Sequence, residues 1–447
     1  MRYAKVVVDV PVLTTNRAFD YIVPEQLEEW IEIGSRVGVP FGGQTIQGFV
    51  VELQEASMVG SDKLKAIKEV LDLYPSLSPE LVQLAGWMSK TYVCHEYTAL
   101  QSMVPSALKA KYERYIRVDL DMAQQSILSP EAQQVVLAVT KAQPILVDEL
   151  FKQFPDASGI LKEMLRQGLL LETRAAKGRV AIKKLLTVSP ACSKEELSAW
   201  INQLPAQSRK QKEVLLHFQN HSEPVLLTEL VKQLNISSAA VKTLEKKGIL
   251  KVEEVEVFRD PYAERTFPRT TALPLTPDQA EVLEEILQAL RQVQKETFLL
   301  HGVTGSGKTE VYLQAIEFCL SQGREAIVLV PEISLTPQMV ERFKSRFGDE
   351  VAVLHSRLSA GERYDEWRKI MMKNARVVIG ARSAVFAPLT RIGLIIIDEE
   401  HESSYKQEES PKYHARDVAE MRAQYHQAAV ILGSATPSLE SYYAAHK

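Results

Sequence analysis

Residues 302–309 read Gly-Val-Thr-Gly-Ser-Gly-Lys-Thr, which is the spacing of a loop that wraps a phosphate group. Glycines in such a loop let the backbone turn its N–H groups inward, and the helix that follows adds a partial positive charge. We expect the Lys308 ammonium to reach the β- and γ-phosphates of ATP and the Thr309 hydroxyl to bind Mg²⁺. A glycine-rich turn that matches this spacing by chance is the alternative. The predicted ATP-binding residues of the loop are Gly302, Gly305, Ser306, Gly307, Lys308 and Thr309.

Two acidic residues follow an apolar segment of the kind that forms a buried parallel strand. Residues 393–397 read Gly-Leu-Ile-Ile-Ile, and Asp398 and Glu399 come directly after them. Open α/β sheets bind their ligands at the carboxyl ends of the strands. We therefore expect Asp398 to bind Mg²⁺, and Glu399 to position and deprotonate the attacking water. An acidic strand end without any partner is the alternative.

Aromatic and basic residues alternate in the segment after this acidic pair. Residues 401–417 interleave tyrosines with lysines and an arginine, a combination suited to stacking on bases and pairing with phosphates of single-stranded nucleic acid. A solvated charged loop is the alternative. We expect His401 to link this loop to Glu399 and count it with the catalytic residues. The other residues predicted to contact nucleic acid or to couple it to the nucleotide are Tyr405, Lys406, Tyr413 and Arg416, then Arg382 near a neighbouring strand end, and Ser434 and Thr436.

A parallel sheet must hold these motifs together. Residues 278–447 alternate helix-like and strand-like patterns, which predicts one α/β domain. Before it, four prolines within residues 258–277 predict an extended linker, and Thr276 can cap a helix that carries Pro277 in its first turn. The expected strands are 298–301, 326–330, 351–354, 376–380, 393–397 and 429–432.

Two further regions precede this domain. Residues 1–110 show short strands separated by turn residues and then a helical pattern, which predicts a β-rich domain with a helical tail. Residues 111–257 contain a repeat at an offset of eighty residues, as in 144–146 (Pro-Ile-Leu) and 224–226 (Pro-Val-Leu). Each copy has the element order of a winged helix. Two packing modules with solvated lysines are the alternative.

Composition limits the classes of protein that fit. With 447 residues, 45% of them hydrophobic, the chain can bury several cores. A net charge of −4 excludes a polycation that coats nucleic acid. Three cysteines without a Cys-x-x-Cys pair predict a reducing, cytoplasmic setting and no cysteine zinc site in this chain. No apolar run reaches about eighteen residues, so we expect no membrane span.

Taken together, the motifs of residues 275–447 closely resemble the PriA family of primosomal replication-restart DNA helicases, in helicase superfamily 2. The resemblance implies a RecA-like lobe and ATP-dependent 3′-to-5′ unwinding at stalled or abandoned replication forks. It also implies binding of forked and single-stranded DNA, of the single-stranded DNA-binding protein, and of primosome and helicase-loading proteins. Gln279 is then expected to read the adenine base. The segments that carry the resemblance are 302–312, 331–338, 355–356, 380–384, 398–406, 413–417 and 433–438.

The N-terminal region is similar to the same family, in which it binds the 3′ end of a nascent strand. The Asp20 carboxylate could accept a hydrogen bond from a free 3′-hydroxyl and repel the phosphate of a continuing chain. Phe19 or Tyr21 offers a stacking face and Lys65 a phosphate contact, while Gly42 lies in a matching turn. Taken from the residues alone, the segment is a strand with one exposed acid.

The expected fold is therefore multidomain α/β, with a small β-rich N-terminal domain, tandem winged-helix-like α+β units and one RecA-like lobe. Family members continue with a second lobe, whose arginine reaches the γ-phosphate, and with zinc-binding cysteine clusters. This sequence has neither, so we expect a chain truncated after its first lobe that hydrolyses ATP weakly. A non-catalytic fork-binding protein with a nucleotide-operated switch is one alternative. An ATP-binding-cassette protein is another, because residues 358–362 loosely resemble the signature of that class.

Overall fold

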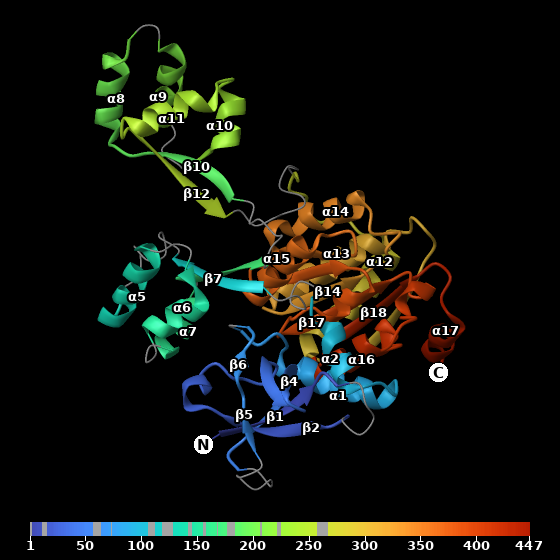
Figure 1. Cartoon of the computed structure of the whole chain (residues 1–447). Helices are drawn as coiled ribbons and strands as arrows, with labels where there is room; N and C mark the ends of the chain where they lie inside the picture. Colours follow the sequence, from blue (N-terminus) through green and yellow to red (C-terminus); the bar gives the residue numbers. More distant parts are fainter. Residues whose placement is uncertain are drawn as a thin grey trace. The chain divides into compact units, whose positions relative to one another are not determined.

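The described part of the chain falls into two compact units, one formed by residues 1–173 with 260–447 and the other by residues 174–259 (Figure 1). The computed structural model describes residues 2–10, 16–56, 64–72, 74–105, 112–118, 128–141, 145–154, 158–167, 169–176, 184–205, 208–220, 225–256 and 267–447.

A six-stranded sheet forms the N-terminal domain, in the order β5-β2-β1-β4-β3-β6. The turn between β3 and β4 needs positive φ at both Gly42 (+54°) and Gly43 (+84°), a conformation that glycine adopts without steric cost. The four longer strands confirm those predicted from the alternation of the sequence. The elements are β1 (Arg2–Val8), β2 (Ala18–Val23), the 3₁₀ helix η2 (Glu25–Leu27), β3 (Arg36–Phe41), β4 (Gln44–Gln54), β5 (Lys65–Ala66) and β6 (Glu69–Val70).

Two helices follow, α1 (Pro79–Thr91) and α2 (Glu96–Met103). The Ser78 hydroxyl caps α1 by accepting a hydrogen bond from the Leu81 N–H at 3.2 Å. Arg422, which is 0% exposed, donates two hydrogen bonds to the Glu80 carboxylate, at 2.8 and 2.9 Å. Because Arg422 belongs to a helix of the C-terminal domain, this ion pair fixes α1 to that domain.

Two winged-helix-like modules end in the same order of elements, a short strand, two helices and a longer strand. The first contains β7 (Tyr112–Val118), α5 (Pro130–Lys141), β8 (Ile145–Leu146), α6 (Val147–Gln153), α7 (Ser158–Arg166) and β9 (Leu170–Ala176). The second contains β10 (Lys184–Pro190), α8 (Lys194–Gln203), α9 (Arg209–Asn220), β11 (Val225–Leu226), α10 (Leu227–Gln233), α11 (Ser238–Lys246) and β12 (Leu250–Glu256). Their sheets have matching orders, β8-β7-β9 and β11-β10-β12. The last four elements of each module start eighty residues apart, as the sequence repeat predicts.

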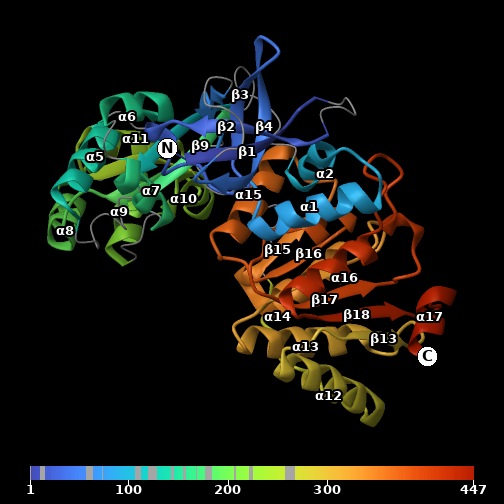
Figure 2. The ribbon, with the colours of Figure 1, turned by 90° about the horizontal axis from the view of Figure 1, so that it is seen from below.

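The C-terminal domain is a parallel six-stranded sheet in the order β13-β18-β17-β14-β16-β15. Helices α12, α13 and α14 pack on one face, and α15, α16 and α1 on the other (Figure 2). All six predicted strands are confirmed. The elements are α12 (Pro277–Gln292), β13 (Thr297–His301), α13 (Lys308–Ser321), β14 (Glu325–Leu329), α14 (Pro337–Phe347), η4 (Gly348–Glu350), β15 (Val351–Leu354), α15 (Ala360–Met371), β16 (Val377–Gly380), η5 (Arg382–Phe386), β17 (Ile392–Asp398), η6 (Ser403–Tyr405), α16 (Ala415–His426), β18 (Ala429–Ser434) and α17 (Leu439–Ala445).

Candidate nucleotide site and nucleic-acid interface

Sheet register brings the chemical motifs to one edge. Asp398 at the end of β17 lies opposite Gly433 of β18, and His301 at the end of β13 lies opposite Ser434. The Gly302 N–H donates to the Ser434 carbonyl at 3.1 Å, so the start of the phosphate loop is held beside β18. Residues that lie far apart in the sequence therefore meet at the carboxyl ends of three neighbouring strands.

The phosphate loop has the backbone that its glycines predict. Gly305 and Gly307 have φ of +82° and +85°, and Gly307 immediately precedes α13. The Lys308 ammonium lies against the loop and donates to the carbonyls of Gly302, at 2.6 Å, and Val303, at 3.4 Å. Its charge is thus at the place where the sequence pattern predicts a phosphate.

Gln279 ties the first helix of this domain to the phosphate loop. Its side-chain oxygen accepts from the Thr276 N–H at 2.9 Å, and its amide nitrogen donates to the Ser306 carbonyl at 2.7 Å. A Cβ atom at Gly307 would overlap that amide. Both ends of the amide therefore have partners within the protein, and recognition of adenine by Gln279 stays a prediction.

A cavity of about 1010 Å³ opens beside the loop. It holds the hydroxyl, ammonium and carboxylate groups that a triphosphate with Mg²⁺ needs, on Lys308, Thr309, Asp398 and Glu399. Sequence analysis did not predict the other residues that line this cavity, and the prolines before α12 indicated only a linker. One wall of the cavity is made by Pro268, Thr270, Thr271 and Leu273 of the segment before α12 and by Gln338, Glu341, Arg342, Ser345 and Arg346 of α14.

Hydrogen bonds fix this wall to the helices beside it. The Leu273 N–H donates to the Glu310 carboxylate at 3.0 Å, and the Thr270 N–H donates to the Ser345 carbonyl at 3.1 Å. Arg346 binds the same Glu310 carboxylate at 3.0 and 3.1 Å. Glu310 therefore joins the segment before α12 to both α13 and α14.

Asp398 is held by two tyrosines. The Tyr312 hydroxyl donates to the Asp398 carboxylate at 3.0 Å, and the Tyr405 hydroxyl donates to its backbone carbonyl at 2.6 Å. Burial raises the pKa of the Asp398 carboxyl, against the opposing effect of the Tyr312 hydrogen bond. Sequence analysis missed Tyr312. The available signal is a tyrosine four residues after Lys308, on an otherwise apolar helix face.

Glu399 and the predicted coupling residues form one cluster. Glu399 has a left-handed φ of +47°, which is strained for a residue with a side chain. The His401 imidazole lies 3.8 Å from the Glu399 carboxylate, 2.8 Å from the Ser434 hydroxyl and 3.4 Å from the Thr436 hydroxyl. The structure thus brings Glu399 and His401, predicted to be catalytic, together with Ser434 and Thr436, predicted to couple the nucleotide to nucleic acid.

The two tyrosines of the loop after β17 do not face solvent. Tyr405 and Tyr413 are each 1% exposed. The Tyr405 hydroxyl also donates to the Leu329 carbonyl at 3.1 Å, and the Tyr413 ring packs on Phe386 at 5.0 Å between centroids. The prediction that these rings stack on nucleic-acid bases is contradicted by this burial. The loop folds inward and pairs the Tyr405 hydroxyl with strand-end carbonyls, which its composition alone does not reveal.

The arginines predicted to bind phosphates have protein partners. Arg382 donates to the Lys406 carbonyl at 2.6 Å and lies 5.8 Å from the centre of the Tyr413 ring. Arg416 donates to the Ser441 hydroxyl at 3.1 Å and lies 3.6 Å from the Glu400 carboxylate. Here both arginines fasten loops, whereas the Lys406 side chain is exposed.

The predicted 3′-end residues come from two parts of the N-terminal sheet: residues 19–21 and Lys65 lie on the neighbouring strands β2 and β5, and Gly42 lies in the turn between β3 and β4. Phe19 packs edge-to-face on Phe41, which precedes Gly42, at 5.3 Å between centroids. Lys65 pairs with Tyr21 across β5 and β2. Tyr21 is 4% exposed and donates to a backbone carbonyl, so it is not a free stacking face. The alternation of β2 points Asp20 away from the buried Tyr21.

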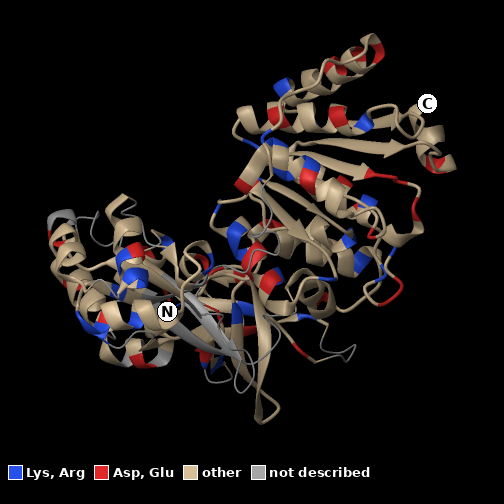
Figure 3. Ribbon diagram, turned by 90° about the horizontal axis from the view of Figure 1, so that it is seen from above, with Lys and Arg blue, Asp and Glu red and all other residues tan. Residues whose placement is uncertain are grey.

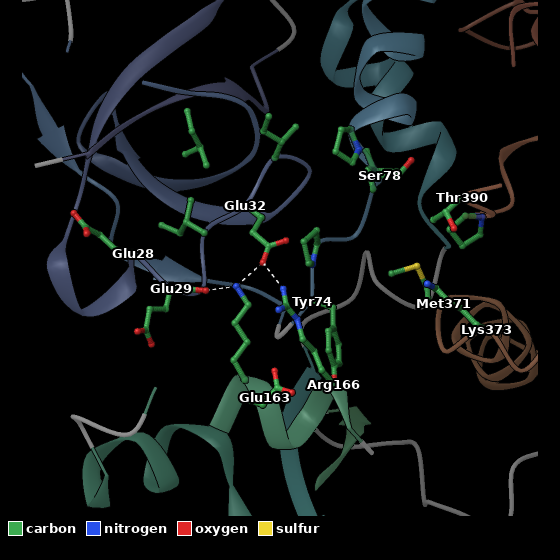
Figure 4. Close-up of a pocket in the computed structure, with 18 of the residues that line it drawn as sticks. Glu28, Glu29, Glu32, Tyr74, Ser78, Glu163, Arg166, Met371, Lys373 and Thr390 are labelled. Carbon is green, nitrogen blue, oxygen red and sulfur yellow. Dashed lines mark hydrogen bonds and ion pairs between the residues drawn. The ribbon is translucent and has the colours of Figure 1, made fainter. Parts of the chain in front are cut away.

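Charge is interspersed over the described residues, with lysines and arginines next to acidic residues (Figure 3). A second cavity of about 780 Å³ lies beside Glu32, which pairs with both Lys162 and Arg166 (Figure 4). It has no glycine-rich loop among its lining residues.

Within the described ranges no group of three or more His, Cys, Asp or Glu residues is placed to hold a metal ion. Among the helices that the structure describes, none is both long and apolar enough to cross a membrane.

Comparison with known proteins agrees with this geometry. Family models match residues 5–105 (3′DNA-binding domain, 3′BD, of PriA), 183–257 (winged helix domain, PriA helicase, Bacteroidota) and 276–444 (DEAD/DEAH box helicase). The Replication restart protein PriA of Bacillus subtilis (strain 168) is 47% identical over 451 residues, covering 100% of this chain and 55% of the relative. The Replication restart protein PriA of Synechocystis sp. is 34% identical over 464 residues, which cover 100% of this chain and 53% of the relative. RecG bound to a three-way DNA junction has a TM-score of 0.30 and 18% identity, with 57% of this chain and 36% of that chain covered, too low to bear on the argument.

The parallel sheet, the phosphate loop and the acidic strand end define a P-loop helicase lobe of the DEAD/DEAH class. A 3′DNA-binding domain and a winged helix accompany it. Over the residues that it spans, the chain belongs to the PriA family of replication restart proteins. It spans about half the length of the curated relatives it matches.

Proposed function

We propose that this chain acts in an ATP-dependent DNA helicase that recognises stalled or abandoned replication forks, unwinds DNA in the 3′-to-5′ direction and restarts replication by primosome assembly. The observation that carries the proposal is the cavity beside the phosphate loop, where Lys308, Thr309, Asp398 and Glu399 converge. The names of the relatives support the replication-restart role.

Each residue of the cavity has a task in ATP hydrolysis. Lys308 binds the β- and γ-phosphates, and the Thr309 hydroxyl and Asp398 carboxylate hold Mg²⁺, which neutralises charge on the phosphates when bound. Glu399 orients the attacking water and takes its proton. Through the imidazole of His401, the state of Glu399 is transmitted to the Ser434 and Thr436 hydroxyls.

DNA contacts come from two places in this proposal. The N-terminal domain receives a free 3′-hydroxyl at Asp20, with Phe19 and Lys65 beside it and the Gly42 turn behind Phe19. The loop after β17 contacts single-stranded DNA through its exposed Lys406 rather than through its buried rings. Forked DNA, the single-stranded DNA-binding protein and the helicase-loading proteins of the primosome are the proposed partners.

ATP turnover measured with and without forked DNA tests the proposal. We expect DNA to stimulate turnover, and Lys308→Ala to abolish the stimulated rate while leaving DNA binding intact. By itself this chain is expected to turn ATP over slowly, since the family resemblance implies an arginine from a second lobe, and losing such a group costs about 10³ to 10⁵ in rate. Fork binding with nucleotide binding but no DNA-stimulated turnover would instead favour a non-catalytic, nucleotide-switched fork-binding protein.

Two substrates test the finer points. A fork that ends in a 3′-hydroxyl should bind more tightly than the same fork with a 3′-phosphate, and Asp20→Asn should reduce that preference. Strand displacement should require a 3′ single-stranded tail on the translocation strand. Equal binding of both forks would refute the role of Asp20, and displacement only from a 5′ tail would refute the direction.

A further inference from the structure

The Tyr312 hydroxyl is buried against the metal-binding edge of the sheet. Tyr312 is 0% exposed and lies on α13, four residues after Lys308. A buried phenol needs a hydrogen-bond acceptor, and here the acceptor is the Asp398 carboxylate at 3.0 Å.

Gly433 makes room for this hydroxyl. A Cβ atom built at Gly433 would overlap the Tyr312 hydroxyl oxygen and lie 3.4 Å from the Asp398 carboxylate. Gly433 also pairs with Asp398 across β18 and β17, and its carbonyl accepts from the Glu400 N–H at 3.0 Å. The lack of a side chain at 433 is thus what lets α13 reach the acidic strand end.

We propose that Tyr312 is a positioning residue that orients the Asp398 carboxylate toward the Mg²⁺ of the bound nucleotide. The inference rests on the proposed ATP site. Because one carboxylate oxygen accepts from Tyr312 and the Tyr405 hydroxyl holds the backbone carbonyl of the same residue, Asp398 is fixed at both ends. The Glu399 backbone N–H also bonds this carboxylate, which lines the cavity that would receive the metal. A side chain that hydrogen-bonds to a metal ligand orients that ligand and affects how tightly the site binds the metal.

The test measures metal binding rather than turnover alone. Mn²⁺ bound to the chain in the presence of ADP can be counted by electron paramagnetic resonance, since Mn²⁺ takes the oxygen ligands of Mg²⁺. We expect Tyr312→Phe to weaken Mn²⁺ binding in this complex about 10-fold, the low end of effects seen when such partners are removed. ADP binding without metal and fork binding should change by less than about 2-fold, because sites without shared partners behave independently.

A matched control and a second perturbation accompany it. Tyr97→Phe removes a hydroxyl that bonds Asp9, another tyrosine–aspartate pair, in the N-terminal domain, and should leave Mn²⁺ binding unchanged. Gly433→Ala keeps the phenol but displaces it from Asp398, and should weaken Mn²⁺ binding as Tyr312→Phe does.

Folded Tyr312→Phe protein with the Mn²⁺ affinity of the wild type would overturn the inference. So would equal weakening by Tyr97→Phe, which would show a general loss of rigidity. Failure of the wild-type chain to bind Mn²⁺ with ADP would overturn the proposed nucleotide site itself, together with this inference, and is therefore distinguishable from the first result.

Discussion

The ion pair between Glu80 and Arg422 should be a large contributor to the attachment of α1 to the helicase lobe. Arg422 is fully buried and also donates to the backbone carbonyls of Val385 and Ala387, at 2.7 and 2.9 Å. Burial opposes the ionisation of Glu80, but the charge and hydrogen bonds of Arg422, together with His426 at 3.7 Å, outweigh it and lower the Glu80 pKa to about 2.

Two estimates of the effect of Arg422→Met agree. Removing one partner of a buried ion pair costs about 3 to 5 kcal/mol, because the other charge is left buried without compensation. Lowering the pKa of Glu80 from 4.5 to about 2 corresponds to about 3 kcal/mol in favour of the folded state at neutral pH, and the charge of Arg422 is the largest of the stabilising causes, with its hydrogen bonds and His426 contributing the rest. Because Glu80 is 6% exposed, little of this effect is screened by solvent. We expect a loss of about 3 kcal/mol, a sizeable part of the roughly 5 to 15 kcal/mol of a typical domain.

Hydrogen exchange measures this loss locally, since a chain of several domains does not unfold in one step. Protection of residues 79–91 and 415–426 should fall together in Arg422→Met, while the second winged-helix-like module exchanges as in the wild type. The stabilisation is present above the unfolded pKa near 4.5 and is lost as the pH falls through 2. A Glu80→Met/Arg422→Met double variant should be more stable than Arg422→Met alone, because it leaves no unpaired charge. A loss below about 1 kcal/mol, typical of exposed pairs, would refute the reasoning.

Three further outcomes are expected. Gln279→Ala removes the tie between α12 and the phosphate loop together with a capping interaction, and should destabilise α12 by about 1 kcal/mol, as measured by hydrogen exchange. Tyr405→Phe leaves the carbonyls of Asp398 and Leu329 without that donor, and should destabilise the strands that end at these residues by about 1 to 3 kcal/mol, as measured by hydrogen exchange. Arg382→Ala frees the loop after β17, so trypsin should cut at Lys406 faster than in the wild type, and an unchanged rate would contradict its role as a fastener.

Local signals in the sequence predicted much of this fold. Apart from β13, whose residues are half-buried or exposed, each strand of the parallel sheet is a short apolar run buried on both faces, a pattern that is hard to confuse with a surface segment. The phosphate loop depends on positive φ at Gly305 and Gly307, and the glycines that allow this conformation can be recognised within one short segment of the sequence. The cap at Thr276 is equally local.

Partners from distant segments were not predictable in the same way. Tyr405 and Tyr413 belong to a polar loop whose composition suggests exposure, yet both are buried. The Tyr405 hydroxyl bonds the carbonyl of Leu329, which lies 76 residues earlier, and the Tyr413 ring packs on Phe386. Arg382 and Arg416 are likewise occupied by groups that only the folded chain brings near. The sequence around Tyr312 does not indicate which group accepts its hydrogen bond, because that group, Asp398, lies 86 residues later.

The attachment of α1 has a consequence for the order of folding during synthesis. Glu80 and Arg422 are 342 residues apart. At roughly 5 to 20 residues per second, a ribosome that has made α1 needs about 20 to 70 s to make its partner helix. During that time α1 can pack on α2 and the N-terminal sheet, but it lacks α16 and the other parts of the helicase lobe that complete its hydrophobic cluster. The side of α1 that contacts the helicase lobe is therefore uncovered on the nascent chain for that time, and we expect chaperones to bind there first.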